Sequence, residues 1–273
     1  MTTADDTLET LATRAVRGDR DALGRVCVAL QGPVYGLALR MLGHPQDAED
    51  ASQEILVQVA THLSQFRGHS QLSTWAYRIA ARHLVRFRRS RAELAATEIH
   101  QIAGAIDAGL ALTPPHALPE GDARLLEEEV RLTCTQAMLL CLSRHERIAY
   151  LLGHVLGAND ATGARICGIS AQAFRQRLSR ARRTLEPLLA ERCGLADPAN
   201  PCSCPRQAAA KQLLGPIKVR LAALPRAPES VARASAQLRV LNRVGHLFAI
   251  DPPIAAPETL WRRICAAVPD LTS

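Results

Sequence analysis

Apolar residues recur at three- and four-residue intervals over positions 48–66, and this spacing confines the segment to an amphipathic helix. The stripe consists of Ala48, Ala51, Ile55, Val59, Leu63 and Phe66. Similar spacing recurs along the chain, in which aromatic residues make up only 3%. Strands of a β-sandwich would be enriched in aromatic and β-branched residues. The sequence therefore predicts an all-α protein built from small helical domains.

The net charge of the 273-residue chain points to a polyanionic partner. It is +7, with a pI near 9.3, and the positive charge is clustered along the chain rather than spread evenly for solubility. No apolar run approaches the roughly 18–20 residues that span a bilayer, and the N-terminus has no features of a secretory signal. We therefore expect a cytoplasmic protein with no membrane contact, whose eight cysteines are thiols or metal ligands rather than disulfides.

The first block of the chain, residues 7–91, contains an acidic helix start. Asp47, Asp50, Gln53 and Glu54 are expected to turn outward from the apolar stripe, and Glu49 adds another carboxylate. A structural role explains such a cluster, because carboxylates interact favourably with the positive end of a helix dipole. The functional alternative is an acidic surface that binds another protein.

A basic and aromatic stretch follows this acidic helix. No acidic residue occurs between Glu54 and Glu93, while arginines accumulate around Trp75 and Tyr77. An aromatic ring can stack on any base that has left a duplex, and guanidinium groups can hold the phosphate backbone. The stretch therefore indicates a surface for unpaired nucleic acid.

The segment 92–123 is predicted to be a solvated linker between two domains. Its charged residues are all acidic, and glycines and prolines are expected to break any long helix. The breakers are Gly104, Gly109, Pro114, Pro115, Pro119 and Gly121.

The second block, residues 124–191, contains a helix-turn-helix pattern. Gly157 ends one helix and Asn159 or Asp160 can cap the next. Ala164, Gly168 and Phe174 then fall at the small, turn and core positions of the motif, and Ser170 caps the second helix. That helix carries many arginines and no acidic residue before Glu186, which is typical of a major-groove reader. The plain alternative is a solvated basic face.

The third block, residues 192–273, opens with a cysteine cluster and continues with three helical patterns. Cys193, Cys202 and Cys204 are candidate metal ligands, although their spacing is not that of a standard zinc site. A closed site would need a fourth ligand, which Cys265 or His246 could supply. The alternatives are a redox sensor, or a proline-rigidified turn in which the cysteines are apolar filler. Core packing is expected for the remaining cysteines, Cys27, Cys134, Cys141 and Cys167.

Two stretches resemble the extracytoplasmic-function branch (group 4) of the sigma-70 RNA polymerase sigma factors. The first is D-A-E-D-A-S-Q-E at 47–54, followed by F-R-G at 66–68 and S-T-W-A-Y-R-I-A at 73–80. The second is the run 169–182, which is similar to the region that reads the −35 promoter element. The resemblance covers residues 7–91 (region 2) and 124–190 (region 4).

The resemblance implies roles for particular residues. Contacts with core RNA polymerase, through its β′ clamp helices and β flap, would involve Asp47, Glu49, Asp50, Gln53 and Glu54. Contacts with the −10 element would involve Arg67, Trp75, Tyr77, Arg78, Arg82, His83, Arg86 and Arg89. Contacts with the −35 element would involve Ser170, Gln172, Ala173, Arg175, Gln176, Arg177, Ser179, Arg180 and Arg183. An anti-sigma factor is a further candidate partner, and the linker would run through the nucleic-acid channels of the polymerase.

Some positions depart from the family pattern. Arg82 stands where an asparagine is common, so the base preference of relatives does not transfer to this chain. Thr162, Gly163 and Cys167 replace the usual acidic and aliphatic residues. Because glycine inside a helix costs on the order of 1 kcal/mol relative to alanine, we expect a less stable second domain.

The sequence thus predicts a sigma factor with a regulatory helical extension at residues 192–273. No enzyme motif is present, and no cofactor is required beyond a candidate metal ion at the cysteine cluster. The main alternative is a helix-turn-helix regulator that binds duplex DNA without polymerase. A metal-binding sensor with incidental basic faces is a third hypothesis.

Overall fold

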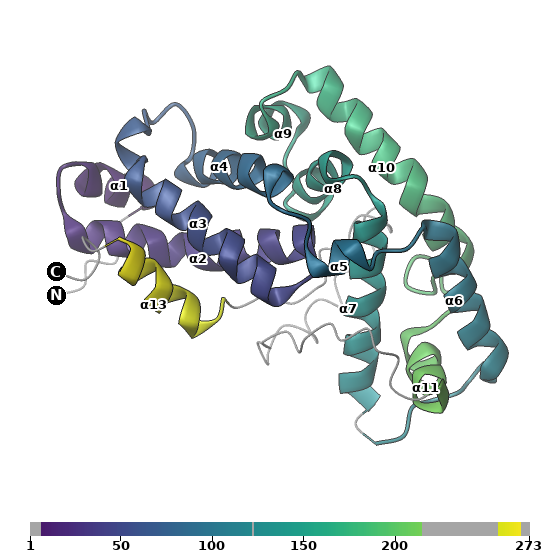
Figure 1. The fold of residues 1–273 in the computed structure, drawn as a ribbon. Coiled ribbons are helices and arrows are strands. Elements are labelled where there is room, and N and C mark those ends of the chain that lie inside the picture. Colours follow the sequence, from purple (N-terminus) through teal and green to yellow (C-terminus); the bar gives the residue numbers. More distant parts are fainter. Residues whose placement is uncertain (1–6, 122, 215–255, 269–273) are drawn as a thin grey trace.

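The structure, a computed structural model, describes residues 7–121, 123–214 and 256–268. The regular elements in these ranges are helices, packed as in Figure 1, which confirms the all-α prediction. The first bundle contains α1 (Leu8–Val16), α2 (Arg20–Leu42), α3 (Pro45–Thr61), the short η1 (Leu63–Gln65) and α4 (Leu72–Arg86).

Capping residues define both ends of α2 in the first bundle. Asp19 caps α2 by accepting a hydrogen bond from the backbone N–H of Ala22. Gly43 ends α2 with φ of 68°, a left-handed conformation that suits glycine. The apolar stripe of α3 is buried against α2 and α4, with Ala48, Ala51 and Ile55 each 0% exposed. The periodicity therefore gave the correct buried face.

One described helix, α2, is long and apolar enough to cross a membrane by length and composition. This helix is not an uninterrupted apolar run, because Asp21, Arg25 and Arg40 lie within it. In the structure, 56% of the most apolar 18-residue stretch of α2 is buried, because α2 packs against α1, α3 and α4. A central core helix of a bundle meets the same compositional test as a membrane span.

The segment predicted to be a linker holds α5 (Arg91–Leu94) and α6 (Ile99–Leu112). The expectation that glycines would prevent a long helix here is wrong. Gly109 allows a close approach, because a Cβ there would lie 2.3 Å from Oε1 of Gln207. The helix ends only at Thr113, before the first proline of the segment.

The second block contains α7 (Ala123–Cys141), α8 (Arg144–Tyr150), the π-helical turn η2 (Leu151–Val155), α9 (Asp160–Cys167) and α10 (Ala171–Arg192). Asn159 caps α9 through the backbone N–H of Thr162 at 2.9 Å, and Ser170 caps α10 through that of Ala173 at 3.1 Å. Gly168, with φ of 66°, makes the turn between the two helices. These features confirm the predicted helix signals.

Gly163 has a packing role that its helix propensity does not reveal. A Cβ at this position would lie 2.2–2.7 Å from ring atoms of Phe174, which is itself fully buried. Glycine is therefore what allows α9 to pack against the aromatic core residue of α10. Its propensity cost therefore comes with a packing requirement that alanine would not meet, and the lower stability of the second domain stays a prediction.

Two helices are described in the third block, α11 (Cys204–Leu214) and α13 (Glu258–Ala267). The former packs against α6 and α7, and the latter lies on α3 of the first bundle (Figure 1). The predicted third helical pattern is confirmed by α13. The first pattern coincides with α11 only in part, and the second, 231–248, lies outside the described residues.

Candidate protein and nucleic-acid interfaces

The outer face of α3 carries the acidic residues that the sequence singled out. Glu54 is exposed, and Glu49, Asp50 and Gln53 are half-buried because α13 lies along this face. We call Glu49, Asp50, Gln53 and Glu54 the acidic face. It has the carboxylates and the amide of a surface that could bind a basic protein segment.

Asp47 does not belong to this face, so the prediction that it turns outward is wrong. Its side chain is 1% exposed and binds Arg88 Nη2 at 2.7 Å. Its other oxygen accepts the backbone N–H of Arg91 at 3.0 Å. Asp47 therefore joins the start of α3 to the chain after α4, a structural role that the helix-dipole explanation only partly anticipated.

Three arginines, Arg78, Arg82 and Arg86, form an exposed basic row along α4. The row lines a cavity of about 340 Å³ that also has Arg177 and His145 in its wall. Since α4 packs on α9, the basic row of the first block and one arginine of the second face the same space. This arrangement concentrates positive charge in a concave site, which attracts polyanions.

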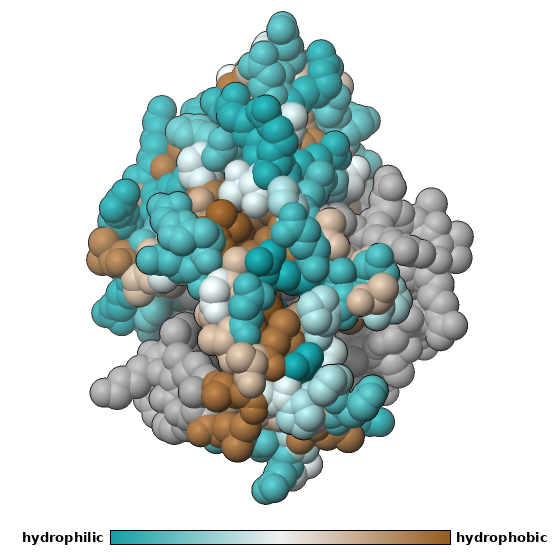
Figure 2. Space-filling view, turned by 90° about the vertical axis from the view of Figure 1, so that its right-hand side faces the viewer, coloured by the Kyte–Doolittle hydropathy of each residue, from teal (hydrophilic) through white to brown (hydrophobic). Residues whose placement is uncertain are grey.

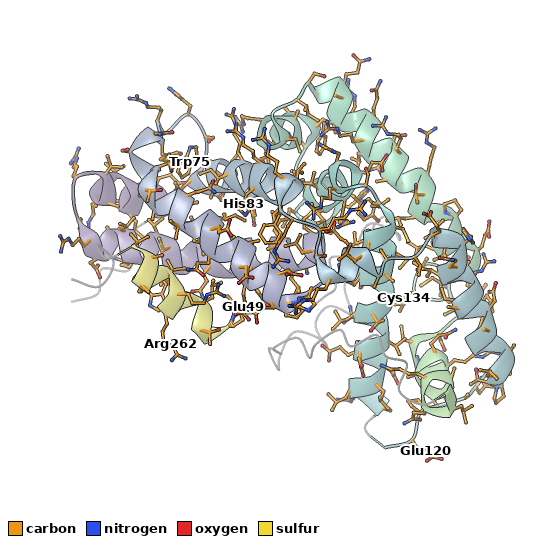
Figure 3. All side chains as sticks on the ribbon, viewed as in Figure 1. Glu49, Trp75, His83, Glu120, Cys134 and Arg262 are labelled. Carbon is orange, nitrogen blue, oxygen red and sulfur yellow. The ribbon has the colours of Figure 1, made fainter. Side chains whose placement is uncertain are left out.

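The aromatic residues of α4 point in different directions. Trp75 packs against Phe66, with ring centroids 5.8 Å apart, and is only half-buried (Figure 3). Tyr77 instead lines a pocket with Leu151 and Val155, and burial raises the pKa of its hydroxyl. Trp75 is therefore available to stack on a base, whereas Tyr77 is placed for packing against the second block.

His83 links α4 to α3 rather than pointing outward. Its Nε2 lies 3.4 Å from Oε2 of Glu54, and its Nδ1 shares a 3.3 Å hydrogen bond with the amide of Gln58. Burial lowers the pKa of His83, partly opposed by the Glu54 carboxylate. A neutral, half-buried imidazole is a weak phosphate ligand, so the exposed Arg67 and Arg89 are better placed than His83 for the predicted DNA contact.

The outward residues of α10 are exposed as the helix-turn-helix pattern predicts. Among them are Gln172, Gln176, Ser179 and Arg183. Ala173 and Arg177 are half-buried, and Ser170 uses its hydroxyl as the helix cap.

Two of the arginines on α10 are paired with acidic residues of neighbouring helices. Arg175 lies 3.5 Å from Asp160, and Arg180 lies 3.1 Å from Glu146. Exposed ion pairs of this kind contribute little to stability, so phosphates can replace the carboxylates at small cost.

A buried ion cluster that the sequence analysis did not identify joins the two blocks. Glu93 of α5 binds Arg144 Nη2 at 2.5 Å and Arg147 Nη1 at 2.9 Å. Arg144 also donates to the carbonyls of Phe87 and Arg88, and Arg147 donates to that of Met41, so both arginines of α8 hold the first bundle. Glu93 is the first acidic residue after the long basic stretch, which is a signal in the sequence. The sequence analysis places Glu93 in the predicted linker, so its pairing with α8 is not anticipated.

The pKa of Glu93 reflects this setting. Burial alone would raise the pKa of its carboxyl. Hydrogen bonds from Arg144 and the Ser90 backbone, with the charges of both arginines, instead lower it to about 2.

The predicted cysteine cluster lines an apolar cavity of about 370 Å³ between α6, α7 and α11. Cys193 and Cys202 lie side by side on neighbouring chain segments. Cys204 and Cys134 also line the cavity, and Cys134 is marked on α7 in Figure 3. Figure 2 views this side of the molecule and shows hydrophobic surface between hydrophilic side chains. Cys265, proposed as a fourth ligand, lies on α13 instead, and His246 is outside the described residues.

Two thiols of this cluster are protonated when no metal ion is bound. Burial raises the pKa of Cys202 to about 11 and that of Cys204 to about 12, so both thiols are protonated at neutral pH. Across the residues that the structure describes, no group of three or more histidine, cysteine or acidic side chains is arranged to hold a metal ion. The metal site at Cys193, Cys202 and Cys204 stays a prediction, and in the structure these side chains line the apolar cavity.

Comparisons with known proteins find sigma factors as the relatives of this chain. A family model described as sigma-70 region 2 matches residues 28–93, from within α2 to α5. RNA polymerase sigma factor CnrH of Cupriavidus metallidurans is 31% identical over 192 residues, which cover 68% of this chain and 95% of the relative. RNA polymerase sigma-H factor of Pseudomonas aeruginosa is 29% identical over 194 residues, covering 66% and 95%. The solved complex of CnrH with the cytosolic domain of CnrY matches with a TM-score of 0.47 and 24% identity, over 68% of this chain and 98% of that chain.

Proposed function

Because the chain belongs to the extracytoplasmic-function branch of the sigma-70 RNA polymerase sigma factors, we propose a division of work among its surfaces. As a sigma factor it binds core RNA polymerase and directs it to promoters. The observation that carries the proposal is the placement of an acidic face on α3 beside an arginine row on α4 of the same bundle. A regulator that only binds duplex DNA needs neither.

The acidic face would bind core polymerase. Glu49, Asp50 and Gln53 present hydrogen-bond acceptors and one amide on a rigid helix, which suits recognition of a basic helical surface. Asp47 supports this face from behind, through Arg88 and the backbone of Arg91, without touching the partner.

The arginine row and Trp75 would capture the −10 element after it has opened. Stacking of one base on an aromatic ring contributes about 1–3 kcal/mol, and Arg78, Arg82 and Arg86 would hold the backbone of the same strand. Tyr77 and His83 would act only by positioning α4, since their side chains pack against η2 and α3.

The exposed face of α10 would read the −35 element in the major groove. Arginine bound to guanine through two hydrogen bonds contributes about 1–3 kcal/mol of discrimination. Arg175, Gln176 and Arg180 project from the part of α10 that follows its Ser170 cap. Since promoters and polymerase are cytoplasmic, the protein is expected in the cytoplasm, and an anti-sigma factor remains a candidate partner.

Transcription from a promoter library with purified core polymerase, with and without this protein, tests the proposal. Promoter-specific initiation should depend on the protein, and an Arg78→Ala and Arg82→Ala double variant should still assemble with core polymerase but fail to open the −10 region. Arg124→Ala, an exposed arginine at the start of α7, is the control for lost charge. Tight duplex binding without polymerase, and no added transcription with it, would contradict the proposal.

A further inference from the structure

The C-terminal helix α13 occupies the acidic face of α3. Arg263 Nη2 lies 2.8 Å from Oδ1 of Asp50, and its Nη1 lies 3.8 Å from Oε2 of Glu49. The hydroxyl of Thr259 donates to the same Glu49 oxygen at 3.4 Å, and the amide of Gln53 donates to the Arg263 carbonyl at 3.3 Å. Three of the four residues of the acidic face therefore already contact α13.

An apolar contact fixes α13 in this position. Leu260 and Ile264, one turn apart on the helix, are both 0% exposed and belong to the main hydrophobic core. The amide of Gln31 on α2 donates to the carbonyl of Pro257, the N-cap residue, at 3.4 Å. Burial of these aliphatic side chains stabilises the contact, so the position of α13 does not depend on surface charge alone.

The positive charge of α13 is placed to match the acidic face that this helix covers. Its two arginines are adjacent, but only Arg263 faces the carboxylates of α3. Arg262 is exposed and points away from α3, as Figure 3 shows beside the labelled Glu49. One helix therefore supplies both a contact residue and a neighbour of identical charge that does not make the contact.

We propose that α13 inhibits the protein in cis by competing with core RNA polymerase for Glu49, Asp50 and Gln53. This rests on the proposed function of the acidic face. A carboxylate that pairs with Arg263 cannot pair with a polymerase residue in the same direction, and a helix lying on α3 excludes a second helix. Polymerase can bind only when α13 leaves α3.

The covalent link sets the strength of this competition. A tethered segment meets its site at an effective concentration that the linker sets and that does not change with protein concentration. The apparent dissociation constant for polymerase equals the intrinsic constant divided by the fraction of molecules with α13 released. If that fraction is about one in ten, removing the α13 contact tightens apparent binding about tenfold.

Arg263→Glu in the full-length chain is the first test, with Arg262→Glu as the matched control. Repulsion from Asp50 and Glu49 should release α13 and lower the apparent Kd for core polymerase about 3- to 10-fold. The control makes the same charge change on the same helix and should stay within about twofold of wild type. Equal effects of both substitutions would show a general charge effect and would overturn the proposal.

Ile264→Asp tests the apolar contact separately. It should tighten polymerase binding by up to about tenfold, while circular dichroism confirms that the helical bundle remains folded. If this variant does not fold, hydrogen exchange of the wild-type chain decides. Amides of α13 should lose protection when core polymerase binds, and retained protection in the holoenzyme would overturn the proposal.

These results separate the inference from the function on which it rests. If no form of the chain binds core polymerase, the proposed function fails. If wild type, Arg263→Glu and Ile264→Asp all bind equally tightly, the function stands and inhibition by α13 fails. Weaker binding by both variants would instead make α13 part of the polymerase interface, which also overturns the proposal.

Discussion

At the scale of single residues, the environment of a side chain decides a role that its type leaves open. Asp47 and Asp50 lie one turn apart in the same acidic cluster, yet the former is buried against Arg88 and the latter borders the solvent. Sequence periodicity could not separate them, because the contact that buries Asp47 comes from the chain after α4. Gly163 is a similar case, since only the position of the Phe174 ring explains why a glycine stands inside α9.

Gly163→Ala should destabilise the protein by about 1–3 kcal/mol, because the added methyl group must displace the ring of Phe174. Gly104→Ala is the control, since a Cβ there has no neighbour within 4 Å. It should stabilise α6 by about 0.5–1 kcal/mol. Urea unfolding of both variants measures the two effects, and a neutral result at Gly163 would contradict the packing.

Asp47→Ala should also lower stability, by about 1–3 kcal/mol, because it leaves the Arg91 N–H and the Arg88 guanidinium without their buried partner. Glu54→Ala removes an exposed carboxylate of the same helix and should change the free energy of unfolding little. Thermal unfolding distinguishes them. Equal losses would mean that the exposed position contributes as much as the buried one.

Glu93 should make stability depend on pH. Its pKa is lowered from 4.5 to about 2, so the folded state favours the charged form. The resulting stability, up to about 3 kcal/mol, is present above pH 4.5 and is lost as the pH falls through about 2. Urea unfolding between pH 7 and 3 should show a smaller loss for Glu93→Gln than for wild type, with Glu120→Gln, an exposed glutamate, behaving as wild type.

At the scale of elements, local signals predicted the helices whose ends depend on neighbouring residues. Asn159, Gly168 and Ser170 end or cap helices as the helix-turn-helix pattern predicts. The existence of α6 was missed because its glycines were read by propensity alone. Its packing against α7, α10 and α11 outweighs that cost. The position of α13 on α3 also could not be predicted, because it depends on contacts between residues far apart in the chain.

At the scale of the whole molecule, the two surfaces that we propose bind DNA border one cavity. Arg82 and Arg177 line the same space, and α4 packs on α9. Promoter elements named −10 and −35 lie about 25 base pairs apart, or about 85 Å at 3.4 Å per pair. If the proposed surfaces bind both elements, the two blocks separate first, and both the Glu93 cluster and the packing of α4 on α9 must break.

Glu93→Arg should separate the blocks, because it places a third positive charge against Arg144 and Arg147 and leaves both without a counter-charge. The radius of gyration in solution scattering should rise above that of wild type. Adding Arg144→Glu should restore part of the compactness by providing a new pair. If the single variant stays as compact as wild type, apolar contacts alone hold the blocks together.

The attachment of α13 to the chain that it covers fixes the stoichiometry of inhibition. Every molecule carries one copy of its inhibitor, so raising or lowering expression does not change their ratio, and dilution does not release it. A free inhibitor protein, in contrast, can be outnumbered. The proportion of active molecules would thus be set by the α13 equilibrium itself, and a single proteolytic cut between α11 and α13 would make activation permanent for that molecule.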